Sequence, residues 1–169
     1  MPDFLTRDVS LLGALLVVAV VAIAVVTDLR QRKIYNALTF PAMAIGLAVN
    51  GTLDGPSGVA FAVTGLLLGA VLFVLPVALL GRGAGDLKLL AAVGALGGPT
   101  FVIWCAMLTG IAGALFGVAV LLRSRRLGEV VAGMTLDAAS GQFPAATSCI
   151  RLPYAVPIAA GAVLTLAFF

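Results

Sequence analysis

Residues 9–27 read VSLLGALLVVAVVAIAVVT, a run of mostly apolar side chains without a single charge. A helix of about 20 apolar residues is long enough to cross the hydrocarbon core of a bilayer, which is about 30 Å thick. The residues before this run include Asp3, Arg7 and Asp8 and are net acidic, whereas a secretory signal peptide begins with basic residues. We therefore predict that this run is a transmembrane helix of the mature protein.

The composition of the whole chain is also that of a membrane protein. Of its 169 residues, 62% are hydrophobic and 10% are charged, and the mean hydropathy is +1.21. An ordinary soluble domain is roughly 45–50% apolar and about 25% charged. A water-soluble globule is therefore excluded.

Five further apolar segments follow the first, so the sequence predicts an all-α polytopic membrane protein with about six transmembrane helices in one domain, 1–169. We expect these helices at Val9–Thr27, Ala37–Val49, Gly58–Leu80, Asp86–Gly97, Thr100–Leu122 and Leu152–Phe169, with a tight turn at 50–56 and a loop at 127–150. The second and the fourth helices each contain about 13 clearly apolar residues, which span roughly 20 Å. We expect these two helices to be short.

Basic residues mark one side of the predicted bundle. Nine of the ten lie in the connections after the first, third and fifth helices: Arg30, Arg32, Lys33, Arg82, Lys88, Arg123, Arg125, Arg126 and Arg151. The positive-inside rule places these loops in the cytoplasm, so we expect both termini outside. Because the positive charge lies in membrane loops, we expect membrane lipid and not nucleic acid as a partner, despite the net charge of +3.

The chain contains few side chains that could carry chemistry. It has no histidine, which excludes a Ser-His dyad, a histidine zinc site and a histidine proton shuttle. Its cysteines, Cys105 and Cys149, lie far apart without a C-x-x-C spacing, and we expect no metal and no cofactor. Among the seven acidic residues, Asp28 ends the first predicted span and Asp86 begins the fourth, both on the predicted cytoplasmic side. Ionisable groups at membrane depth are costly and indicate function.

Two carboxylates on one side of a membrane are the components of an aspartyl protease. One takes a proton from water while the other, protonated, polarises the scissile carbonyl. Gly83 and Gly85 precede Asp86 and allow backbone to approach a ligand closely. The dipoles of their own helices favour Asp86 as the carboxylate and Asp28 as the acid, but the basic residues after Asp28 oppose this. We therefore predict that the two aspartates act as a pair, and we do not assign which of them is the ionised carboxylate and which is the acid.

Two motifs carry a resemblance to a known family. Residues 28–36, DLRQRKIYN, resemble the first-aspartate motif of the type IV prepilin peptidases, D-x-R-x-x-x-I-P-N. Residues 83–88, GAGDLK, resemble the second motif of that family, G-x-G-D-x-K. The resemblance extends to the six-span layout, the glycine-rich fourth helix and the opening of the last span, Pro153–Pro157. Tyr35 stands where the family often has proline.

This resemblance implies an aspartic endopeptidase of the inner membrane that removes the leader peptide of prepilins or pseudopilins at the cytoplasmic face. The catalytic pair would be Asp28 and Asp86, and the supporting or substrate-binding residues would be Arg30, Asn36, Gly83, Gly85 and Lys88. Larger members carry an extra cytoplasmic domain with paired cysteines and also N-methylate the pilin. This chain has neither feature, so it resembles the short, peptidase-only members that process Flp-type pilins of tight-adherence systems. We do not expect methyltransferase activity, and the oligomeric state is left open.

Three alternatives use the same residues. A proton- or cation-coupled transporter could use the two carboxylates as ion sites, but it predicts an acidic group near the bilayer midplane, which no predicted span contains. A non-catalytic scaffold of a secretion machine would make the aspartates dispensable. The presenilin-like G-x-G-D proteases carry their first aspartate in a Y-D motif, whereas Thr27 precedes Asp28 here.

Overall fold

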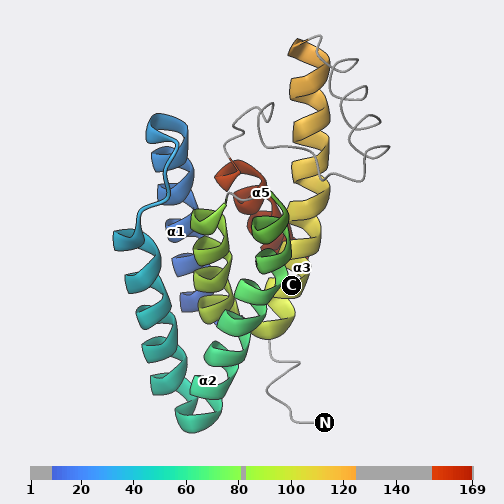
Figure 1. Cartoon of the computed structure of the whole chain (residues 1–169). Coiled ribbons are helices and arrows are strands. Elements are labelled where there is room, and N and C mark those ends of the chain that lie inside the picture. Colours follow the sequence, from blue (N-terminus) through green and yellow to red (C-terminus); the bar gives the residue numbers. More distant parts are fainter. Residues whose placement is uncertain (1–8, 81–82, 125–153, 169) are drawn as a thin grey trace.

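The computed structural model describes residues 9–80, 83–124 and 154–168. These ranges form four helices and no strand: α1 (Leu11–Gln31), α2 (Asn36–Leu80), α3 (Ala84–Ser124) and α5 (Ala155–Phe168) (Figure 1). The predicted all-α class is confirmed for this part of the chain. The loop predicted at 127–150 and Cys149 lie outside the described residues.

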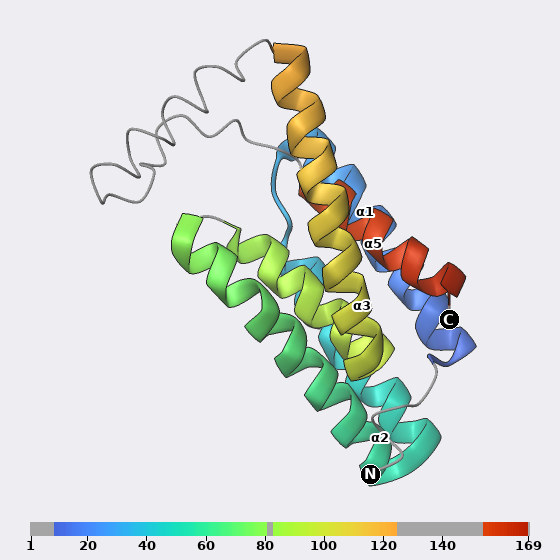
Figure 2. The same ribbon diagram turned by 90° about the vertical axis from the view of Figure 1, so that its right-hand side faces the viewer.

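Helices α2 and α3 are each broken once, at a glycine with positive φ. Gly55 has φ 62° and ψ −138°, and Gly98 has φ 83° and ψ −177°. Glycine adopts such a backbone at little steric cost. Pro99 follows the second break, where its missing N–H and fixed φ suit the first turn of a helix. Each helix therefore folds back on itself as a hairpin (Figures 1 and 2).

The two breaks divide the described chain into helical segments close to the predicted ones. The turn predicted at 50–56 is narrower than expected, because residues 50–54 stay helical and only Gly55 leaves the helix. The second segment is therefore longer than predicted, whereas the fourth, at 84–97, is short as predicted. α1, Asn36–Val74 and Ala84–Val120 are long and apolar enough to cross a membrane, and α5 is a shorter apolar helix. The chain is thus a membrane protein, while six spans and external termini remain predictions.

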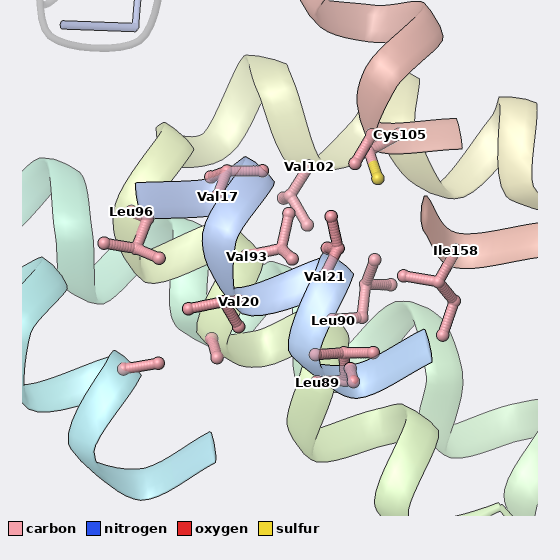
Figure 3. Packing of buried hydrophobic residues seen from close by; sticks show 14 of the residues in the cluster. Val17, Val20, Val21, Leu89, Leu90, Val93, Leu96, Val102, Cys105 and Ile158 are labelled. Carbon is pink, nitrogen blue, oxygen red and sulfur yellow. The ribbon is translucent and has the colours of Figure 1, made fainter. Parts of the chain in front are cut away.

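The first half of α3 forms the centre of the bundle. All residues from Leu89 to Pro99 are buried, and α1, α2 and α5 pack against α3. Figure 3 shows how valine and leucine side chains of α1 and α3 interlock with Ile158 of α5. Small residues such as Gly94 and Ala95 bring the backbones close, which is how helices associate where lipid provides no hydrophobic drive. This core fixes where the helix ends meet.

Asn50 provides a buried polar link between α2 and α3. It is 2% exposed, and its amide nitrogen donates to the carbonyl oxygens of Gly46 (2.9 Å) and Ala95 (3.1 Å). We expect Asn50→Leu to lower the free energy of unfolding by about 1 kcal/mol, the size of an interhelical hydrogen bond in a membrane. Thermal unfolding in detergent measures this loss.

The matched control for Asn50 is Thr52→Val. Thr52 is exposed, and its hydroxyl donates to the carbonyl of Val49 within the same helix, 2.9 Å away. We expect the control to unfold at the temperature of the parent. Equal effects of the two substitutions would show that the link from Asn50 to α3 contributes nothing.

Candidate active site

Asp28 lies in the last turn of α1 and is 8% exposed. The helix ends at Gln31 and is capped by Arg32, which adopts a left-handed conformation (φ 52°) and donates its backbone N–H to the Asp28 carbonyl at 2.8 Å. The carboxylate oxygen Oδ2 of Asp28 accepts a hydrogen bond from the backbone N–H of Ala155 at 3.1 Å. Ala155 is the first residue of α5, and the first N–H groups of a helix have no partner within it. The Asp28 carboxylate therefore caps α5.

Asp86 lies in the first turn of α3 and is partly buried. Gly83 has φ 103°, and its carbonyl accepts the N–H of Leu87 at 3.0 Å, so the chain turns sharply into the helix. Gly85 is close to the loop before α2, because a Cβ added there would lie 3.1 Å from the Cβ of Ile34. The two glycines thus act through turn geometry and close approach, and they set the position of the Asp86 carboxyl group.

The structure brings Asp28 and Asp86 together from two different helices. Their carboxyl groups lie close enough for their charges to act on each other. The end of α1 and the beginnings of α2, α3 and α5 all lie at the same end of the bundle (Figures 1 and 2). The site is therefore assembled from helix ends rather than from the middle of any helix.

Lys88 joins the beginning of α3 to the beginning of α2. Its Nζ donates to Oδ1 of Asn36 at 2.9 Å and lies 5.4 Å from the centre of the Phe40 ring. A cation over an aromatic face and a charge-assisted hydrogen bond both favour this position. Two of the predicted supporting residues thus contact each other, and one of them, Lys88, is two residues after Asp86. Arg30, the remaining basic candidate, is exposed in the last turn of α1.

The beginning of α5 contributes two groups to which the sequence pattern assigned no role. One is the N–H of Ala155, which holds Asp28. The other is Tyr154, whose hydroxyl lies within electrostatic reach of Asp86. The stretch Pro153–Pro157 was part of the family resemblance, but no spacing rule connects it to an aspartate so far away in sequence. Only the packing of α5 against α1 and α3 shows this connection.

The arrangement places two acidic groups near each other at one end of the bundle. Such a pair can take a proton from water with one carboxylate and donate one with the other. Among the described residues, no three His, Cys, Asp or Glu side chains are grouped so as to hold a metal ion. Two neighbouring carboxyl groups are suited to acid–base chemistry.

The sequence model of the type IV leader peptidase family matches residues 15–118, a range that includes both aspartates. No curated protein and no solved structure matches the chain.

Proposed function

The chain belongs to the type IV leader peptidase family, and on this basis we propose that it removes the leader peptide of Flp-type prepilins or pseudopilins. In this proposal, cleavage takes place at the cytoplasmic face of the inner membrane, and Asp28 and Asp86 are the catalytic pair. The membership makes the protein a membrane-bound peptidase. The observation that supports the pair is that two helix ends bring their carboxyl groups within electrostatic reach of each other. The absence of methyltransferase activity remains part of the proposal.

The proposed reaction is hydrolysis by an activated water. One aspartate, ionised, takes a proton from the water as its oxygen attacks the scissile carbonyl carbon, while the other aspartate donates its proton to the carbonyl oxygen. The tetrahedral intermediate then loses the amine, which receives the proton taken from the water, and the hydroxyl proton returns to the second aspartate. The products are a carboxylic acid and an amine, and the pair returns to its starting state. Close like charges favour one shared proton in such a pair.

The substrate reaches the site from the membrane. We propose that the prepilin, anchored by its own apolar helix, presents its leader junction at the end of the bundle where the aspartates lie. The family resemblance implies cleavage after a glycine and a glutamate a few residues into the mature chain. Arg30 is exposed two residues after Asp28 and is suited to pair with that glutamate. Lys88 bonds to Asn36 at the beginning of α2, so it is suited to hold the first turn of α3, which carries Asp86, in place.

The link between Lys88 and Asn36 gives a test of this positioning role. We expect Lys88→Met and Asn36→Leu each to lower the rate of cleavage about fivefold, which corresponds to about 1 kcal/mol. The double variant should lose no more than the worse single variant, because the two side chains act as one unit. Initial rates of prepilin cleavage in detergent measure these effects.

Lys33→Met is the matched control for charge, since Lys33 is an exposed lysine in the loop between α1 and α2. We expect it to cleave at the rate of the parent. Additive losses from Lys88→Met and Asn36→Leu would contradict the link.

Co-expression with a candidate prepilin tests the proposed function as a whole. Leader removal makes the pilin shorter, and we expect membranes that contain the chain to convert the prepilin to the shorter form on a gel. A transporter would instead leave the prepilin at full length and produce ion flux in liposomes that contain the chain alone. Flux without cleavage would overturn the proposal.

A further inference from the structure

Tyr154 and Ala155 are adjacent in sequence and reach both aspartates. The N–H of Ala155 donates to Oδ2 of Asp28 at 3.1 Å. The charge of Asp86 acts on the hydroxyl of Tyr154. The beginning of α5 therefore lies against both carboxyl groups, and Tyr154 brings a further polar group to them.

Residues of two helices, α2 and α3, contact the Tyr154 side chain. Its ring packs edge-on against Phe73 of α2, with the ring centres 6.2 Å apart and the planes at 71°. Its hydroxyl lies over Gly113 of α3, where an added Cβ would be 2.8 Å from the hydroxyl oxygen. The position of the hydroxyl thus depends on the absence of a side chain at Gly113. A phenol held in this way is ordered before substrate binds, which is what a catalytic hydrogen-bond donor requires.

The hydroxyl of Tyr154 is a donor and not an anion. Burial raises the pKa of this hydroxyl above its usual range, and the negative charge of Asp86 raises it further. The phenol therefore keeps its proton at neutral pH. A partly buried phenol near Asp86, in the residue next to the one that binds Asp28, has a proton to donate to an oxygen that binds beside the two aspartates.

We propose that Tyr154 is a third catalytic residue, whose hydroxyl donates a hydrogen bond to the scissile carbonyl oxygen while negative charge develops on that oxygen, before the protonated aspartate has transferred its proton there. This inference rests on the proposed function, because the peptide bond must lie between Asp28 and Asp86. The hydrogen bond strengthens from ground state to transition state, so it acts on the chemical step more than on substrate binding. No bond to Tyr154 forms or breaks, and its proton stays on the phenol oxygen.

The test is Tyr154→Phe in the purified full-length protein, assayed in detergent with a prepilin. Loss of one preorganised donor to such an oxygen typically lowers kcat by about 10²- to 10³-fold. We expect a fall of this order with KM within about twofold of the parent. Phenylalanine keeps the ring against Phe73, so the thermal unfolding temperature should not change. If Tyr154 only packed against its neighbours and took no part in the reaction, Tyr154→Phe would keep the kcat of the parent.

Two matched controls separate the hydroxyl from general disturbance. Tyr35→Phe removes the same atom from an exposed tyrosine, whose hydroxyl donates to Gln31, and should keep the kcat of the parent. Gly113→Ala should lower kcat because its Cβ displaces the Tyr154 hydroxyl. Gly110→Ala, on the same helix and with nothing within 4 Å of its Cβ, should keep the kcat of the parent.

The outcomes distinguish this inference from the proposed function. If the parent cleaves and Asp28→Asn does not, the proposed function stands whatever Tyr154→Phe does. In that case, a Tyr154→Phe variant with the kcat of the parent, or one that loses kcat together with thermal stability, overturns the role of Tyr154. A parent that leaves every prepilin intact overturns both proposals.

Discussion

We expect Asp28→Asn and Asp86→Asn each to abolish leader removal. Asparagine has the shape of aspartate but can neither take a proton from water nor donate one to the carbonyl oxygen. A positioned acid or base contributes about 10²- to 10⁴-fold to a rate, so we expect cleavage to fall by at least about 10²-fold. The double variant should be no slower than the worse single variant, since the pair acts as one unit. Conversion of prepilin to the shorter pilin on a gel measures the effect.

The asparagine variants should remain folded. In Asp28→Asn, the amide oxygen can still accept the hydrogen bond that the Ala155 N–H donates. Asp54→Asn is the matched control, because Asp54 lies beside the break at Gly55, at the other end of the bundle from the site. This control should process prepilin at the rate of the parent. If Asp28→Asn and Asp86→Asn both still process the substrate, the catalytic pair is wrong.

We expect Gly94→Leu to destabilise the bundle strongly. Gly94 and Gly65 lie so close that a Cβ added to either would overlap the carbonyl oxygen of the other. A leucine at Gly94 must push α2 away from the buried half of α3. We expect it to cost about 3 kcal/mol or more, the upper end of the cost of overpacking a core. Thermal unfolding and the yield of folded protein in detergent measure this loss.

Gly110→Leu is the control for adding a leucine to the same helix. Gly110 is exposed, and nothing lies within 4 Å of an added Cβ. We expect this variant to unfold at the temperature of the parent. A Gly94→Leu protein with the stability of the parent would show that α2 and α3 do not pack as described.

Most of the fold could be predicted from apolar runs and the glycines between them. The segment that ends at Gly97, Gly98 and Pro99 was placed correctly, since glycine and proline end helices locally. The turn at 50–56 was predicted too wide, because its Gly, Asn, Asp and Pro content suggested a loop. In the structure, Asn50 stays helical and bonds to Ala95 of another helix, a tertiary contact that local propensity does not include.

The argument from helix dipoles for the two aspartates was incomplete for a similar reason. It placed Asp28 at the negative end of its own helix, α1, and considered no other helix. In the structure, the positive end of α5 also lies against Asp28, through the Ala155 N–H. The order of the two aspartates therefore cannot be assigned from their own helices alone.

The sequence by itself determined that this is an all-α membrane protein of the type IV leader peptidase family. Apolar length and motif residues are local properties that need no knowledge of packing. Only the tertiary structure decided that Asp28 and Asp86 lie near each other, that Lys88 bonds to Asn36, and that Tyr154 and Ala155 join the site. These are contacts between helix ends far apart in the chain, and they depend on how closely the helices pack around the small residues of α3.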